Sequence, residues 1–316
     1  MLRTRTPSAL HQTIPLFALW WIIMVRDYWE WTVNGSAERD RAFVKKYLLA
    51  VDGILWYFHQ RLQMDGFVGA LPYWNPIGGE DAPGTDLDAA ITTGGSTYVT
   101  ALLLYALEAA YLLHKEAGFQ EEAHRWAETR RRLRESVTSA WNEPRGVWVE
   151  RLTYPDAPVT QHTQAMAILS GAATQRQMTG ATASIADGVL VARMTQQMGI
   201  PFVETLHKAG RFDLAWAQWH DECQMQLDLS LTTWLEGRSD YHAWRAWQPI
   251  EYLRSLLGIR PRQDTDQNSF ITLSPERFWF RSHAGRPGFG LVSCGKRTHR
   301  STFRPNAARC CGKRLL

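Results

Sequence analysis

One carboxylate stands among residues that could carry out chemistry. Glu236 lies in "LTTWLEGRSDYHAW" (residues 231–244), together with two tryptophans, an arginine and a histidine. Sugar hydrolysis uses such a set, because aromatic rings stack on the sugar and a carboxylate activates water. Glu236 is therefore a candidate general base, with Arg238, His242 and Trp244 as candidate substrate-binding residues. A solvated glutamate that follows a helix is the alternative, and composition alone favours that alternative.

A second candidate is the loop sequence "LPYWNP" at residues 71–76. Tyr73 and Trp74 could present flat aromatic surfaces to a sugar, and Asn75 could bond to a hydroxyl group. A loop that is held to the surface by buried aromatic rings is an equally good interpretation of the same residues.

The remaining motifs predict no metal or cofactor. Acidic residues follow the "LPYWNP" loop, but their spacing fits no EF-hand loop. His162, in "TQHTQAMAILSG", has no second ligand four residues away, and the chain has no Gly-x-Ser-x-Gly sequence and no phosphate-binding P-loop. We interpret "GATASIADG" (residues 180–188) as a loop.

Composition points to a folded chain with an unusual tail. The 316 residues are 45% hydrophobic and include 15 tryptophans, enough for one large domain or two smaller ones. Cys223 is the one cysteine before residue 294, so we expect a reducing, cytoplasmic location. Residues 275–316 hold ten of the 35 Lys and Arg and one of the 31 acidic residues. We interpret this tail as aberrant, for example frameshifted, and expect no nucleic-acid partner.

The apolar run Leu16–Val25 resembles part of a signal peptide or a membrane segment, but ten residues are too few to cross a bilayer. A buried helix is the interpretation we prefer, with no membrane partner. Helical periodicity also predicts further helices. They cover residues 17–32, 36–63, 97–117 (ended by Gly118), 121–141, 161–173, 187–198, 203–209, 211–226 and 240–257.

These helices alternate with loops, and no strand-rich region precedes residue 265. A loop at residues 64–95 is long enough to suggest a function. The alternation predicts an all-α ring of helical hairpins, although a bundle or a solenoid fits the same pattern.

Four segments together resemble one family. They are "LFALWWIIMVRDYWEWT", "LPYWNP", "TQHTQAMAILSG" and "LTTWLEGRSDYHAW…IEYLRSLLGIRP", and they are similar, in the same order, to the catalytic domain of bacterial α-L-rhamnosidases of glycoside hydrolase family 78. The resemblance covers about residues 7–262. It implies an (α/α)6 barrel, an inverting mechanism and terminal α-L-rhamnose as the substrate. It also implies that Glu236 is the general base, that His242 contacts the sugar, and that Trp74 lies in a loop forming one wall of the pocket.

The sequence departs from the family at several positions. "IGGED" replaces the usual Asp-Trp after the "YWN" loop, Tyr241 replaces a usual cysteine, and Ser230 stands where glycine is common. The family's general acid belongs to an acidic segment that precedes "PSALHQTIP", and here that region is already at residues 7–15. We therefore expect an impaired enzyme.

The expected organisation is an incomplete (α/α)6 catalytic domain at 1–262, followed by residues 263–316. In the second part "NSFITLSP" begins a remnant of a β-sandwich and the basic tail follows. The expected partner is a glycoside or oligosaccharide, and the sequence assigns no oligomeric state. A non-catalytic carbohydrate-binding or helical scaffold, and a related (α/α)6 hydrolase for another sugar, are the alternatives.

Overall fold

The computed structural model describes most of the chain up to residue 231 and short stretches beyond it. The described residues are 3–5, 11–32, 37–73, 87–187, 191–194, 198–231, 247–248, 251, 254–255, 259–261 and 271–273. The helices are α1 (Pro15–Thr32), α2 (Ala37–His59), α3 (Leu87–Thr93), α4 (Thr97–Glu116), α5 (Gln120–Arg125), α6 (Ala127–Ser139), α7 (Gln161–Leu169), α8 (Gln175–Asp187), α9 (Gly199–Lys208) and α10 (Phe212–Asp228).

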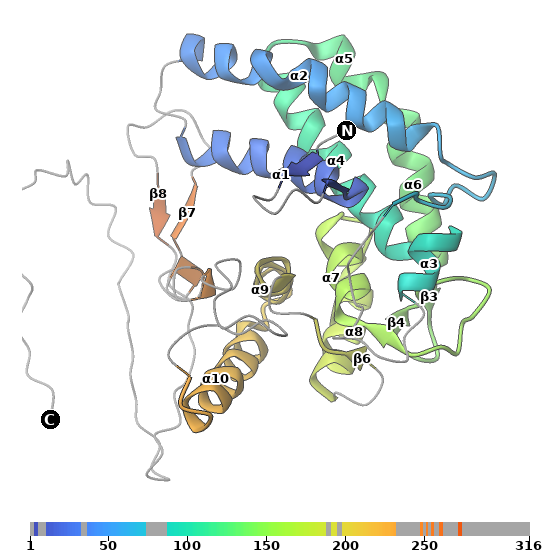
Figure 1. Cartoon of the computed structure of the whole chain (residues 1–316), viewed down its shortest axis with the longest axis vertical. Helices are drawn as coiled ribbons and strands as arrows, with labels where there is room; N and C mark the ends of the chain where they lie inside the picture. The colour runs from blue at the N-terminus through green and yellow to red at the C-terminus, as the bar shows by residue number, and fades with distance from the viewer. Residues whose placement is uncertain are drawn as a thin grey trace, which may run out of the picture.

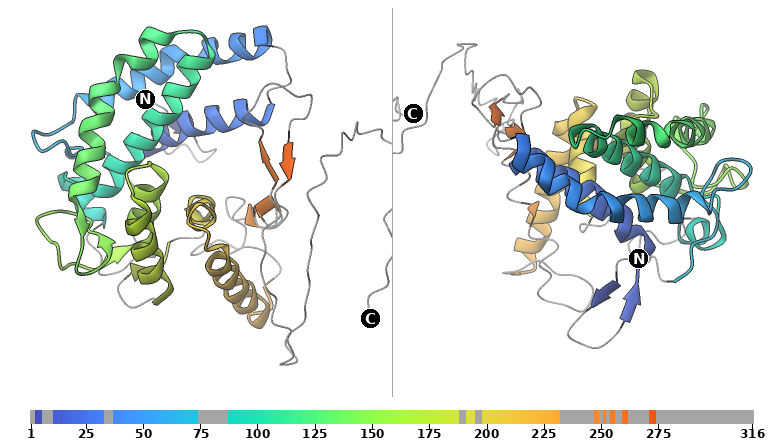
Figure 2. Two further views of the ribbon diagram at one scale, coloured as in Figure 1. Left: turned by 180° about the vertical axis from the view of Figure 1, so that it is seen from behind. Right: turned by 90° about the horizontal axis from the view of Figure 1, so that it is seen from above.

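The strands are short and occur in pairs. They are β1 (Arg3–Arg5), β2 (His11–Thr13), β3 (Trp141–Asn142), β4 (Val147–Trp148), β5 (Val159–Thr160), β6 (Val191–Ala192), β7 (Ile259–Pro261) and β8 (Ile271–Leu273). The β5–β6 pair is parallel, and the other three pairs are antiparallel. Seen from above, the β1–β2 pair projects away from the helices (Figure 2). Strand β8 lies within "NSFITLSP", the segment in which a strand was expected.

The helices form consecutive hairpins. Figure 1 shows them following one another along an arc, from α1 and α2 through α4 and α6, then α7 and α8, to α9 and α10. The first helix of each hairpin packs against the first helix of the next, since α1 contacts α4, α4 contacts α7, and α7 contacts α9. We call α1, α4, α7 and α9 the inner helices.

The inner helices α1 and α4 run in the same direction. The Trp20 indole lies near the Tyr98 hydroxyl, and the Arg26 guanidinium donates to the Tyr105 hydroxyl at 3.0 Å. A later residue of α1 contacts a later residue of α4, so the two helices run in the same direction. Helix α6 instead runs back along α4, because Glu108 of α4 pairs with Arg134 while Tyr111, further along, contacts Arg130 and His124.

Helices α7 and α9 are parallel by the same reasoning. The Thr205 hydroxyl donates to the Ala165 carbonyl at 3.3 Å, and the Lys208 ammonium, three residues later, donates to the Ile168 carbonyl at 2.9 Å. The ring of His162 meets the edge of Tyr98, so α7 begins beside the first turn of α4. The inner helices therefore start at one common end, as in a helical barrel.

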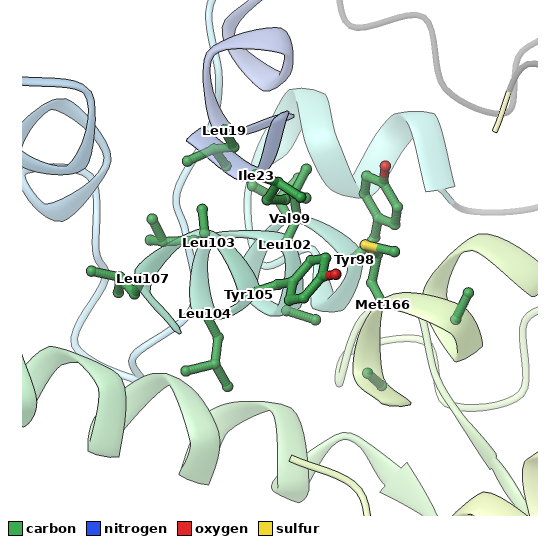
Figure 3. Packing of buried hydrophobic residues seen from close by; sticks show 14 of the residues in the cluster. Leu19, Ile23, Tyr98, Val99, Leu102, Leu103, Leu104, Tyr105, Leu107 and Met166 are labelled. Carbon is green, nitrogen blue, oxygen red and sulfur yellow. The ribbon is translucent and has the colours of Figure 1, made fainter. Parts of the chain in front are cut away.

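Helix α4 is the centre of the hydrophobic core. Figure 3 draws its side chains in one cluster with Leu19 and Ile23 of α1 and Met166 of α7. By length and composition α4 could cross a membrane, but 83% of its apolar window is buried inside the fold. Because apolar side chains surround α4, it is the core helix of the domain.

Several expectations are confirmed. The run Leu16–Val25 is part of α1, and most of its side chains are buried. The stripe of α2 that includes Val51, Ile54 and Phe58 faces the core. Gly118 follows α4 with a positive φ of 86°, the left-handed conformation that commonly ends a helix. Residue 36, where the second helix was expected to begin, lies outside the described residues.

Other expectations are wrong. Residues 180–187 of "GATASIADG" belong to α8, where Gly180 lets the helix approach the Trp141 ring: an added Cβ would lie 3.2 Å from that ring. A helix over 187–198 is not formed, because Val191–Ala192 pairs with β5 as β6. The expected helix at 121–141 is divided at Trp126, whose buried ring packs on Trp56 and His59 of α2. The loop at 64–95 contains α3.

Candidate active site

The N-terminal end of the inner ring, where α1, α4, α7 and α9 begin, is where polar side chains of several helices converge. At the start of α4, the Ser96 hydroxyl accepts from the Val99 amide at 3.2 Å and caps the helix. The preceding Gly94 has a φ of 97°, and a Cβ there would lie 2.8 Å from the Ala70 nitrogen. This close approach fixes the backbone around residue 70 against the start of α4.

Further hydrogen bonds hold the residues that lead into the "LPYWNP" loop. The Val68 amide donates to the Thr100 hydroxyl at 3.1 Å, and the Leu71 amide donates to the Ile91 carbonyl at 3.3 Å. Tyr73 then follows with a φ of 71° and a side chain that is 65% exposed. Tyr73 is thus an exposed aromatic residue at this end. Its neighbours Trp74 and Asn75 lie outside the described residues.

A buried carboxylate, Glu150, organises the start of α7. It accepts from the Thr160 amide at 2.7 Å, from the Thr160 hydroxyl at 2.9 Å and from the Thr163 hydroxyl. The Glu150 carbonyl also accepts from the Thr97 amide of α4 at 3.0 Å. Because Glu150 is fully buried and its donors come from both helices, its role is structural: it links the start of α4 to the start of α7. Glu150 belongs to no motif identified from the sequence.

A chain of amide side chains joins α7, α10 and residue 248. Gln161 donates to the Gln218 side-chain oxygen at 3.3 Å, and Gln218 donates to Glu222 at 3.3 Å. Gln248 donates to the other Glu222 oxygen at 3.4 Å. Glu222, a second carboxylate that belongs to no motif named above, is therefore linked through Gln218 to the start of α7. Trp247 packs against Gly199, the first residue of α9: a Cβ there would fall 2.0 Å from its ring.

Besides the Thr97 hydroxyl, three buried polar side chains at this end have atoms without a hydrogen-bond partner among the described residues. They are the Trp20 indole N–H of α1, the Tyr98 hydroxyl of α4 and both ring nitrogens of His162 of α7. Burial lowers the pKa of His162 to about 3, so its imidazole is neutral. Burial also raises the pKa of Tyr98 well above its usual value. All three groups are therefore neutral at pH 7.

Further from this end, an ionic cluster joins α1 and α9 to Glu251 and Arg254. Arg254 bonds to Glu251 at 2.7 Å and reaches Glu204 of α9 at 3.4 Å, while Arg26 bonds to Asp27. Burial, together with the charges of Asp27 and Glu251, raises the pKa of Glu204 to about 7. A carboxyl with such a pKa is typical of a general acid, but also of an ionic cluster. Because Glu204 pairs with Arg254, we assign the cluster a structural role.

The other predicted site residues cannot be placed. Glu236, Arg238, His242 and Trp244 lie outside the described residues, as do Trp74 and Asn75. Tyr73 is the one predicted site residue that the structure describes. Helix α10 nevertheless lies beside this end of the ring, because Gln218 contacts Gln161 at the start of α7 and Glu222 contacts Gln248.

Comparison with known proteins identifies the fold. No protein-family model matches the sequence, and no curated protein matches it. Among solved structures, a family 78 rhamnosidase of Bacillus sp. GL1 superposes with a TM-score of 0.67 and 22% identity, covering 82% of this chain and 28% of its own. A rhamnosidase from Klebsiella oxytoca with rhamnose bound has a TM-score of 0.62 and 18% identity, covering 80% of this chain and 49% of its own.

The fold is therefore that of an all-α domain built as a helical barrel. More particularly, it is the helical-barrel fold found in family 78 rhamnosidases. The chain spans less than half the length of both of these proteins.

Proposed function

We propose that this chain is part of a glycoside hydrolase of the α-L-rhamnosidase type, which removes terminal α-L-rhamnose with inversion of configuration. The observation that carries the proposal is the superposition of 82% of the chain on a family 78 rhamnosidase. The four sequence segments that resemble that family are a second, independent line of support.

Chain length supports the position of the proposed base. Leu231 follows α10 directly, and Glu236 comes five residues later, a distance of at most roughly 17 Å of extended chain. Trp74 and Asn75 follow Tyr73 directly. We propose that both sets of residues contribute to one sugar site.

The proposed chemistry uses Glu236 as a general base. In an inverting glycosidase the base carboxylate takes a proton from a water molecule that attacks the sugar on the face opposite the leaving group. A second carboxyl group, roughly 6.5–9.5 Å away, protonates the departing oxygen. Arg238, His242 and the aromatic residues Tyr73, Trp74 and Trp244 would hold the sugar, with Asn75 bonding to a hydroxyl group.

Hydrolysis of an aryl α-L-rhamnoside tests this proposal. An aryl leaving group departs with little help from a general acid, so the substrate isolates the contribution of the base. We expect measurable hydrolysis of this substrate by the native chain. Glu236→Gln abolishes it, whereas Glu143→Gln, an exposed change far from this segment in sequence, leaves it intact.

The outcomes separate the candidate functions. Hydrolysis that persists in Glu236→Gln would contradict the assigned base. Binding of L-rhamnose with no turnover by the native chain would point instead to a carbohydrate-binding protein, and turnover of a different terminal sugar would point to a related (α/α)6 hydrolase.

A further inference from the structure

We propose that Trp20, Tyr98 and His162 form the inner wall of the sugar site and bond to hydroxyl groups of a neutral sugar. This inference rests on the proposed function and adds to it three residues from outside the segments assigned there to catalysis and binding. It starts from their shared position: each belongs to an inner helix, within the first two turns, at the end where the inner helices begin.

The side chains have bonding capacity that the described residues do not use. Tyr98 and His162 are both fully buried, and the Trp20 N–H is buried although its ring is partly exposed. A buried polar atom without a partner costs free energy, so such atoms in a native protein call for an explanation. The three come from three consecutive inner helices and lie at the same end of the ring.

The three residues lie close enough to act on one ligand. The rings of Tyr98 and His162 are 6.2 Å apart, edge to face. The Trp20 indole lies beside the Tyr98 hydroxyl, close enough to lower its pKa against the larger raising effect of burial. Figure 3 shows the Tyr98 hydroxyl pointing away from Met166.

The chemistry of these groups selects a neutral polyol. A neutral imidazole offers one donor and one acceptor, a phenol offers both, and an indole donates only. None of the three carries a charge that could balance a carboxylate or phosphate. A sugar ring, which presents several hydroxyl groups that both donate and accept, matches this set.

The test compares sugar affinity with stability. Tyr98→Phe and Trp20→Phe remove a bonding atom while keeping a ring in place. Since no described residue bonds to these atoms, we expect unchanged or higher melting temperatures. We expect affinity for L-rhamnose, measured by calorimetry, to fall by about two- to tenfold in each variant, as for the loss of one neutral hydrogen bond. Tyr111→Phe is the matched control, because it lies on α4 about 20 Å further along the helix.

Three results decide the question. Weaker binding with intact stability supports the inner wall. Unchanged affinity with a lowered melting temperature shows that the atoms serve the fold, for instance through an internal water molecule, and overturns the inference alone. Absence of L-rhamnose binding by the native chain removes the proposed function and the inference with it.

Discussion

At the scale of single residues, Ser230 marks the point where the chain turns from α10 towards the predicted base. Its φ is 56°, a left-handed conformation that costs most L-residues about 1 kcal/mol and costs glycine almost nothing. The Ser230 amide donates to the Leu227 carbonyl at 2.9 Å, as at a helix end. This geometry agrees with the glycine that rhamnosidase-like sequences commonly have at this position.

Ser230→Gly should therefore stabilise the protein by up to about 1 kcal/mol, because it relieves the left-handed strain. Thermal unfolding measures the change. Ala209→Gly is the control, since Ala209 ends α9 with a φ of −80° and glycine there should destabilise by about 0.5–1 kcal/mol. Equal effects of the two substitutions would show that Ser230 carries no strain.

Residue types alone could not reveal the buried groups. Glu150 is one acidic residue among 31, and its role depends on Thr160 and Thr163, which reach it only when α7 forms. The N-cap signal at Thr160 was available in the sequence, and it could have drawn attention to that turn. Tyr98 and His162 are 64 residues apart, so their contact follows from the packing of α4 on α7 and from no local pattern.

At the scale of elements, the ionic cluster ties α9 to α1 and to residues 251–254. Glu204 has a pKa raised from 4.5 to about 7, so between these pH values the folded chain keeps a proton that the unfolded chain releases. The stabilisation is fully present below pH 4.5 and is lost as the pH rises through about 7.

Glu204→Gln should remove this loss, because the amide stays neutral at every pH. Between pH 5 and pH 8 we expect the native chain to lose about 1–2 kcal/mol more stability than the variant, an amount reduced because Glu204 is 32% exposed. Urea unfolding at both pH values gives the comparison. Glu108→Gln, which removes the carboxylate paired with Arg130 and Arg134, should destabilise at both. A parallel pH dependence in native and Glu204→Gln chains would contradict the assignment.

Helices with a clear apolar period could be predicted, and short or interrupted elements could not. The α2 stripe repeats every three or four residues, which is sufficient evidence for a helix. Helix α8 has a short apolar stripe, Met178, Ala181 and Ile185, among small and polar residues, and it packs through Gly180 against Trp141. Strand β6 depends on β5, about 30 residues earlier, so no window around Val191 contains the signal.

At the scale of the whole molecule, the inner helices bring the first turns of α4 and α7, the residues up to Tyr73 and the middle of α10 to one end. The alternation of helices and loops predicted hairpins, but the choice of a ring over a bundle came from the family resemblance. Superposition on rhamnosidase structures confirms that fold. The ring places Tyr73 and, through Gln218 and Glu222, the middle of α10 at this one end. A sugar site there is our central claim.

Hydrogen exchange with and without L-rhamnose, followed by mass spectrometry, tests that claim most directly. We predict slower exchange in peptides from the N-terminal end of the inner ring, at residues 68–73, 94–100 and 158–164, and unchanged exchange in α5 and α6. Protection confined to other parts of the chain, or no protection at a saturating concentration of L-rhamnose, would contradict a sugar site at this end.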